Sequence, residues 1–383
     1  MIKILHTSDW HLGKIIYGVS LIEDQKYFIE KSFFPILKEE QPDLIVISGD
    51  IFDKQIAPIE AIRLFNYTVT RVNKDFKIPI AIISGNHDSK DRMAPISNLL
   101  HDEGVHIVCD LYDENRCIEI KKGNEFVRVC LVPYFDLRCA KEYLSINDEI
   151  SFSKAFRFIL DSFVNKFQEN EVNILVAHSF VTGSKDFEDA RALSLGGVGE
   201  VSPEVFQKFD YVALGHIHTH QKVFNKCYYS GAPLKYSFDE PNVPKSVTVV
   251  EIFEGKINRR YIEIKPRHTM RTIKGTFSDL ISNAKYDSSQ DYICAKIMDK
   301  YPIYMPMEQL RVYYPNIMMI ESNFIHCCED KKLGNKNETI DEIVNNKELI
   351  FKKFLEEICD IEPKESDYKV LREICRKVEE ENQ

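Results

Sequence analysis

Five stretches of the sequence place metal-binding side chains directly after a short apolar run. In chain order the candidates are Asp9 and His11; Asp50 and Asp53; Asn86, His87 and Asp88; His178; and His216 and His218. Carboxylates, imidazoles and a carboxamide are donors by which proteins hold divalent transition metals. The pattern therefore predicts a site for two divalent metal ions.

Each group taken alone has an ordinary structural explanation. Asp50 could cap the helix that follows it, and His178 could be a hydrogen-bonded core histidine. The segment Asp9-Trp10-His11 could be a surface turn, whereas Gly85-Asn86-His87-Asp88 is more specific because it adds a neutral oxygen ligand at a strand end. The ordinary explanations would have to hold five times independently, so the five groups together favour one dinuclear site.

The apolar runs that precede these residues are typical of buried parallel strands, because each is bounded by Gly, Ser or Asp. The runs are Ile2–Leu5, Leu44–Ile47, Ile80–Ile83, Ile174–Val176 and Tyr211–Leu214. Functional residues of open α/β sheets collect at the carboxyl ends of such strands. We therefore expect one rim of one sheet to receive the whole ligand set.

The ligand types indicate the metal and the reaction. A mixed shell suits Mn²⁺, Fe²⁺ or Zn²⁺ better than Mg²⁺, which prefers oxygen and water. Two such ions clamp a phosphoryl group and activate a water molecule. Asp50, central in the sequence order, is the expected bridging carboxylate, and His87 is either the proton donor to the leaving oxygen or only a hydrogen-bonding neighbour. Asp53 and Asp88 are expected to orient ligand imidazoles.

Composition limits the class of protein. The chain has 383 residues and a net charge of −10, which argues against tight, metal-free, non-specific binding of nucleic acid. It does not exclude a nuclease that holds phosphate through metals or through a basic partner. No run approaches the roughly 20 apolar residues of a membrane span, and the ten cysteines include no Cys-x-x-Cys pair. We expect a cytoplasmic protein with reduced thiols, and a further metal site at Cys327-Cys328 is the less favoured alternative.

Four segments follow one another along the chain. Residues 1–265 alternate strand and helix patterns, with helices expected at Glu23–Lys38, Ile59–Val72, Ser153–Gln168 and Pro203–Lys208, which predicts a layered α/β fold. Residues 266–328 follow a strand-helix-strand-helix-strand order, and 329–346 form a polar linker. Residues 347–383 hold two amphipathic helices, which either dock on their own domain or bind a partner.

The complete motif series resembles the calcineurin-like metallophosphoesterase superfamily, and within it the SbcD family of bacterial nuclease subunits. The segments that carry the resemblance are His6–Gly13, Ser48–Asp53, Gly85–Ser89, Ala213–His218 and Tyr229–Phe238. The resemblance implies a layered β-sandwich core flanked by helices, a small α+β capping domain that contacts DNA, and C-terminal helices.

The resemblance also implies residue roles and partners. One metal would take Asp9, His11, Asp50 and His218, and the other Asp50, Asn86, His178 and His216, while His87 acts on the leaving group. Some relatives have a second histidine where this chain has Asp53. The implied activity is Mn²⁺-dependent 3′→5′ exonuclease action on duplex DNA and endonuclease action on single strands and hairpins. The implied partners are DNA, a second copy of this chain as a homodimer, and an SbcC-like coiled-coil ATPase that binds residues 347–383, giving a heterotetramer.

Two other functions fit parts of this pattern. A phosphodiesterase or phosphatase acting on nucleotides or phosphoproteins would need neither the capping domain nor the terminal helices. A scaffold that binds DNA ends without cutting would be expected to have lost ligands, whereas here every ligand position is filled. The nuclease is therefore the function that the sequence favours.

Overall fold

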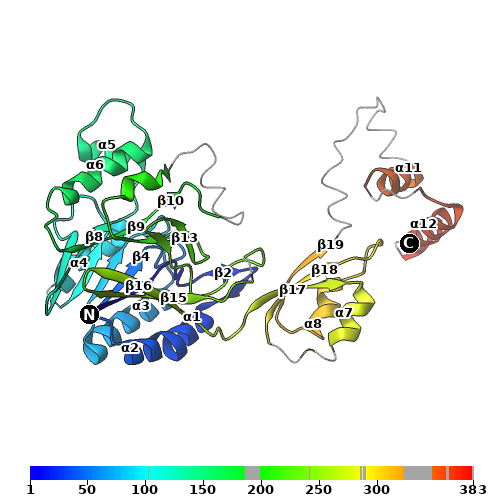
Figure 1. Ribbon diagram of the computed structural model, residues 1–383. Helices are drawn as coiled ribbons and strands as arrows, with labels where there is room; N and C mark the ends of the chain where they lie inside the picture. The colour runs from blue at the N-terminus through cyan, green and yellow to red at the C-terminus, as the bar shows by residue number, and fades with distance from the viewer. Residues whose placement is uncertain are drawn as a thin grey trace. The chain divides into compact units, whose positions relative to one another are not determined.

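The computed structural model describes residues 1–101, 103–185, 199–240, 242–284, 287, 290–322, 347–358 and 362–381. The chain divides into two compact units, Met1–Thr269 and Met270–Gln383 (Figure 1). The expected linker at 329–346 and the pair Cys327-Cys328 lie outside the described residues.

The first unit contains a six-stranded sheet in the order β16-β15-β1-β4-β5-β6. Its strands are β1 (Ile2–Thr7), β4 (Leu44–Ser48), β5 (Ile80–Ile83), β6 (Val105–Val108), β15 (Ser246–Phe253) and β16 (Lys256–Glu263). Strands β1, β4, β5 and β6 pair in parallel, and β15 and β16 continue the sheet in the antiparallel sense beyond β1. Three of the five predicted strands therefore end at the same edge of this sheet.

The other two predicted strands lie in a second six-stranded sheet, in the order β13-β14-β12-β9-β8-β7. Its strands are β7 (Cys117–Lys122), β8 (Glu125–Val132), β9 (Val172–His178), β12 (Tyr211–Gly215), β13 (Gln221–Phe224) and β14 (Cys227–Tyr229). Strands β8, β9, β12 and β14 are parallel neighbours, and β7 and β13 close the sheet in the antiparallel sense.

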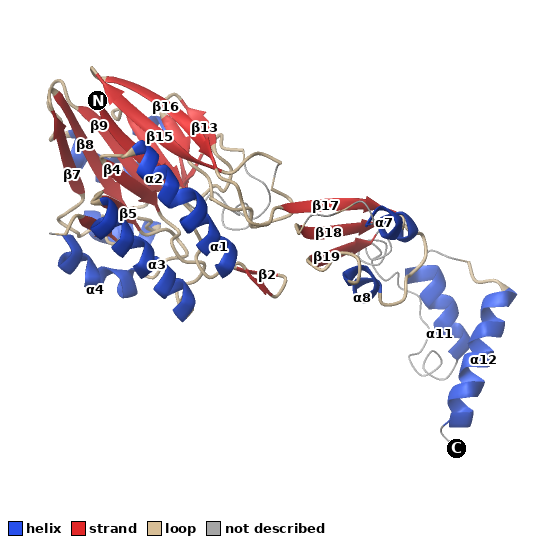
Figure 2. Cartoon of the chain, turned by 90° about the horizontal axis from the view of Figure 1, so that it is seen from below, coloured by secondary structure: helices blue, strands red, loops and turns tan. Residues whose placement is uncertain are grey.

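The single sheet expected from the strand pattern is therefore wrong, whereas the layered β-sandwich that the family resemblance implies is confirmed. Apolar side chains of both sheets form one buried cluster, with Ile4 and Val46 from the first sheet and Val176 and Ala213 from the second. An apolar run predicts that a strand is buried on both faces, but it does not say which strands pair. Parallel strands of both sheets end at a shared edge of the sandwich, so the candidate residues still converge (Figure 2).

Helices cover the outer faces of the sandwich. The first sheet is covered by α1 (Ile22–Phe28), a π-helical turn, α2 (Phe34–Glu40), α3 (Ile59–Arg71) and α4 (Lys90–His101). The second sheet is covered by α5 (Leu137–Leu144) and α6 (Phe152–Val164). Phe156, Ile159 and Phe163 of α6 pack in the core against β8, β9 and β12. The expected helix at Pro203–Lys208 is a short 3₁₀ turn, Pro203–Phe206. Two small ribbons complete the unit: β2 (Ile15–Ile16) with β3 (Val19–Ser20), and β10 (Phe180–Val181) with β11 (Glu200–Val201).

The second unit has the predicted order of strands and helices. It consists of β17 (Met270–Gly275), α7 (Phe277–Asn283), β18 (Tyr292–Ile297), α8 (Pro306–Arg311) and β19 (Ile317–Ser322), and the three strands are parallel. The helices α11 (Lys347–Lys353) and α12 (Glu365–Glu381) follow. No helix within the described part of the chain is both long and apolar enough to cross a membrane.

Candidate metal centre

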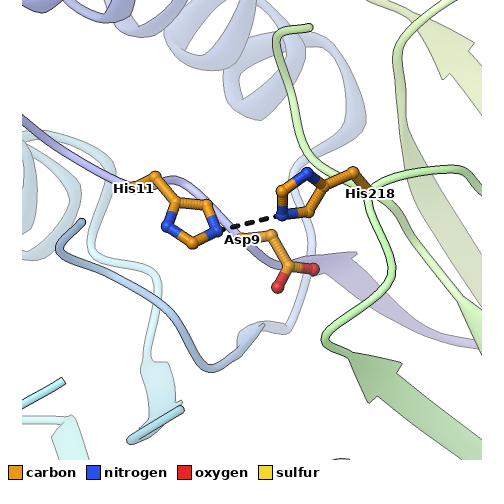
Figure 3. A group of neighbouring side chains, drawn as sticks. All are labelled: Asp9, His11 and His218. Atoms are coloured by element: carbon orange, nitrogen blue, oxygen red, sulfur yellow. Dashed lines mark hydrogen bonds between the residues drawn. The ribbon is translucent and has the colours of Figure 1, made fainter. Parts of the chain in front are cut away.

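All ten predicted residues lie in the loops that follow β1, β4, β5, β9 and β12, or at the ends of these strands. Three groups among them each bring their ligand atoms within 4.8 Å of one another, which is close enough to hold a metal ion. The groups are Asp9, His11 and His218; His11, Asp53 and His87; and Asp9, Asp50 and His178. The first of these joins a loop of each sheet (Figure 3).

The backbone is bent sharply where it presents these side chains. Asp9, His11, Asp50 and His216 have positive φ angles of 53°, 45°, 51° and 108°, which side-chain-bearing residues adopt at a cost of about 1–3 kcal/mol each. Hydrogen bonds between loops hold this geometry. The Asp9 N–H donates to the Gly49 carbonyl at 3.0 Å, and the His11 N–H donates to the Asp50 carbonyl at 3.0 Å.

Asp9, His11 and His218 form one half of the centre. Nε2 of His11 lies 3.1 Å from Nε2 of His218. The carboxylate of Asp9 is fully buried and accepts the backbone N–H of His216 at 2.9 Å. Nδ1 of His11 is buried and has no hydrogen-bond partner among the described residues. Two imidazole nitrogens and a buried carboxylate thus converge on one point.

Asn86, His178 and His216 form the other half. The Asn86 Oδ1 atom lies 2.9 Å from Nε2 of His178 and 3.1 Å from Nδ1 of His216. Asp50 lies between the halves, because its Oδ2 is 3.4 Å from Nε2 of His178 and 3.7 Å from Nε2 of His11. This is the central position that the sequence order suggested.

The donor geometry around His178 fits a cation. Its Nδ1 lies 2.8 Å from the Ser48 carbonyl, which can only accept, so Nδ1 carries the hydrogen. In the neutral ring Nε2 is then a lone pair, and it faces the oxygens of Asn86 and Asp50. Three acceptors pointing at one another require a proton or a metal ion between them. Divalent cations match such a mixed set of donors.

Charge interactions within the centre are strong because it is buried. Burial lowers the pKa of His11 well below its usual value and lowers that of His216 to about 3. Burial also lowers the pKa of His178, but the neighbouring Asp50 carboxylate outweighs this and raises it to about 9. For Asp50 burial opposes ionisation, and the attraction of His178 and His11 nevertheless lowers its pKa. The pKa of Asp9 is raised, chiefly by burial.

His87 is held at the mouth of the centre. Its backbone N–H donates to Asp50 Oδ1 at 2.9 Å, and its Nδ1 donates to the Asp53 carbonyl at 2.8 Å. Since Nδ1 is engaged, Nε2 is the ring atom left for a reacting group. The imidazole stands edge-to-face against His11 with ring centroids 4.9 Å apart.

Asp53 and Asp88 act differently from each other. Asp53 lies 3.7 Å from Nδ1 of His11, which is too far for a hydrogen bond, and it pairs with Lys14 at 2.8 Å. The expectation that Asp88 orients an imidazole is wrong. Its carboxylate accepts the backbone N–H groups of Ile51, Phe52 and Gly85 at 3.1, 2.9 and 2.9 Å. Asp88 therefore fixes the loops that carry Asp50 and Asn86.

Glu240 and Lys245 belong to the surroundings of the centre, and sequence analysis missed both. Glu240 Oε1 lies 3.6 Å from Nδ1 of His218, and Lys245 Nζ donates to the His218 carbonyl at 2.8 Å and pairs with Glu240. Burial opposes ionisation of Glu240, yet Lys245 and His218 lower its pKa to about 2. The available signal was its position just after the segment Tyr229–Phe238, which the family resemblance had already singled out.

The sandwich fold and the ligand set together define a dinuclear-type phosphoesterase. Residues 2–220 match the calcineurin-like phosphoesterase family, and the chain belongs to it. Residues 266–358 match the type 5 capsule protein repressor C-terminal domain. A curated relative, the SbcD component of the nuclease SbcCD from Staphylococcus epidermidis, is 35% identical over 324 residues, which cover 84% of this chain and 85% of the relative. Within the phosphoesterases the chain is a member of this SbcD family.

Two solved structures are distantly similar to this chain. A dimetal phosphatase from Danio rerio has 12% identity and a TM-score of 0.44, and the match covers 69% of this chain and 98% of the phosphatase. The calcineurin-like phosphoesterase YfkN from Bacillus subtilis has 13% identity and a TM-score of 0.38, and the match covers 69% of this chain and 89% of YfkN.

Proposed function

We propose that this protein is a metal-dependent DNA nuclease that acts as the nuclease component of an SbcCD-type repair complex. The proposal rests on one combination of findings. The complete ligand set lies at one edge of the sandwich, in a chain whose residues 2–220 and 266–358 match the two families named above. The 35% identity to the SbcD relative extends over 84% of the chain, which is more than the phosphoesterase fold alone.

The proposed metal ligands are the residues of the two halves of the centre. Asp9, His11, Asp50 and His218 would hold one cation, and Asp50, Asn86, His178 and His216 the other, with Asp50 shared. The support is the group of Asp9, His11 and His218, whose ligand atoms lie within 4.8 Å of one another, and the position of Asp50 Oδ2, which is 3.7 Å from Nε2 of His11 and 3.4 Å from Nε2 of His178. When bound, the cations supply Lewis-acid activation of water and neutralise phosphate charge. The mixed donors suit Mn²⁺.

The protein groups then position the substrate and move the proton. The side chain of His87 offers Nε2 as the proton donor to the leaving oxygen, since Nδ1 is held by the Asp53 carbonyl at 2.8 Å. Asp88 keeps Asp50 and the Asn86 loop in place through the backbone, and the Asp53 carbonyl holds the ring of His87. The proposed reactions are 3′→5′ exonuclease cleavage of duplex DNA and endonuclease cleavage of single strands and hairpins.

The assembly around this site is the remaining part of the proposal. Residues 266–328 would contact DNA, and two copies of this chain would join an SbcC-like coiled-coil ATPase in the cytoplasm through residues 347–383. The helices α11 and α12 contact each other through Phe351 and Tyr368, with ring centroids 6.1 Å apart. The apolar side chains of Ile350, Phe354, Val370 and Ile374 nevertheless stay exposed. Apolar side chains left exposed on paired helices support the partner-binding alternative over docking within the chain.

One experiment tests the activity. The purified chain is given Mn²⁺ and offered linear duplex DNA, a single-stranded circle and bis(p-nitrophenyl) phosphate, beside an Asp50→Ala variant. Degradation of DNA that the variant lacks supports the nuclease. Hydrolysis of the aryl ester with intact DNA would instead favour a small-molecule phosphodiesterase.

A further inference from the structure

A cavity of about 380 Å³ opens beside the metal centre. Its walls come from the loops after β4, β5 and β6, the start of α4, and the segment that leads from β8 into α5. Asn86 and Asp88 belong to its inner wall, so the cavity is continuous with the centre. A volume near 300–1,000 Å³ is ordinary for a site that takes a small organic group.

Tyr134 gives this cavity an aromatic wall. Its backbone N–H donates to the Ser84 carbonyl at 2.8 Å, which fixes the residue on the loop scaffold, and its ring stands edge-on to His178 with centroids 6.2 Å apart. The residue is 41% exposed, so its ring is open to a ligand. A partly exposed tyrosine ring beside a proposed metal ligand is a surface on which a base can stack.

The charges in the cavity exclude a phosphate. Lys90 is the single basic side chain in its described lining, and it is already paired with Asp110 at 3.5 Å. Five acidic side chains belong to the lining: Asp88, Asp91, Asp110, Asp136 and Glu142. Asp110 and Asp136 also accept backbone N–H groups, from Tyr112 at 3.1 Å and from Cys139 at 2.7 Å. A neutral group with amino hydrogens fits such walls, whereas a sugar-phosphate chain would be repelled.

We propose that this cavity is a nucleobase subsite, in which the base next to the scissile phosphate stacks on Tyr134 and offers its amino hydrogens to Glu142. This assignment rests on the proposed nuclease function and deepens it. The backbone of the substrate would pass over the metal centre, and only one base would enter. Bases with an exocyclic amino group, such as cytosine, would be preferred over thymine, because carboxylates accept from the cytosine amino group.

Two kinds of measurement test the subsite. The first measurement compares the variants Tyr134→Ala, Tyr134→Phe and Glu142→Gln. Each is assayed on bis(p-nitrophenyl) phosphate, which has no base, and on the 5′-(p-nitrophenyl) phosphates of thymidine and deoxycytidine. Loss of one stacking contact should raise the KM of Tyr134→Ala for the nucleoside esters by about tenfold. Its KM for the baseless ester should rise much less than its KM for the nucleoside esters, Tyr134→Phe should resemble the wild type, and Glu142→Gln should lose the preference for deoxycytidine.

The second measurement does not depend on turnover. The fluorescence of 2-aminopurine deoxyribonucleoside 5′-monophosphate should be quenched by the wild type and by Tyr134→Phe, and not by Tyr134→Ala. Phe253→Ala is the matched control, because Phe253 is exposed and lies at the opposite end of the first sheet from the centre. Equal losses on both classes of ester, or no change in any variant, would overturn the subsite. A wild type that hydrolyses no phosphodiester would overturn the proposed function instead.

Discussion

The Glu240 carboxylate lies 3.6 Å from Nδ1 of His218, while Nε2 of the same ring lies 3.1 Å from Nε2 of His11. One ring nitrogen therefore faces a buried carboxylate and the other is directed into the centre. A carboxylate in this position fixes the tautomer and the orientation of a ligand imidazole and raises its basicity. Lys245 holds Glu240 in turn, so that His218 is fixed by a chain of two side chains.

We predict that Glu240→Ala weakens Mn²⁺ binding by about 10–100-fold, because His218 loses the group that orients it. The measurement is a titration of the metal-free protein with Mn²⁺, followed by the signal of free Mn²⁺ in electron paramagnetic resonance. Glu251→Ala, on β15, is a control that leaves the His218 surroundings intact. Equal affinities in Glu240→Ala and the wild type would contradict an orienting role.

His87→Ala should retain both metal ions and lose cleavage by about 10²–10⁴-fold, because it removes a proton donor rather than a ligand. The two variants His87→Ala and Asp50→Ala are compared by metal content after dialysis and by rate of duplex degradation. Asp50→Ala should lose metal and activity together. If His87→Ala also came out of dialysis with the metal content of Asp50→Ala, His87 would have to be a ligand.

Gly85→Ala should displace Asp50, although it adds only one methyl group. A Cβ at this position would collide with the carboxylate and the backbone nitrogen of Asp50, and neither can move without disturbing the loop that Asp88 holds. We expect reduced Mn²⁺ affinity and a lower thermal midpoint. Gly275→Ala is the matched control, since its Cβ would meet Asp279 at an ordinary 3.5 Å. A Gly85→Ala protein with normal metal affinity would show that the loop can yield.

Asp88→Ala should destabilise the first unit by about 2–4 kcal/mol, because three backbone N–H groups lose a buried acceptor. Urea unfolding monitored by fluorescence of Trp10, which is buried in this unit, provides the measurement. Asp113→Ala, in the loop before β7, is the control. A variant as stable as the wild type would mean that water replaces the carboxylate without loss.

The strand pattern located the candidate ligands at strand ends but did not reveal the division into two sheets, which only the family resemblance implied, and the reason is physical. A polar side chain after an apolar run must be exposed at a strand end or be neutralised by a partner. Asp50 and His178 can therefore be recognised from the sequence alone. The separation of β9 and β12 into a second sheet depends on which apolar faces meet, and Ile174 and Ile4 are equally apolar. Glu240 escaped notice because it lies in an irregular segment, where position in space follows from tertiary contacts alone.

Removing residues 345–383 should leave a folded nuclease that no longer co-purifies with its ATPase. Every proposed ligand lies between Asp9 and His218, within the first compact unit, so the deletion removes no part of the centre. A milder variant, Val370→Asp with Ile374→Asp, keeps α12 and places charges on side chains that are 58% and 54% exposed, which should weaken capture of the coiled-coil ATPase. Pull-down with tagged ATPase and Mn²⁺ titration of each variant are the measurements. Undiminished capture by both variants would place the partner interface on another surface of the chain.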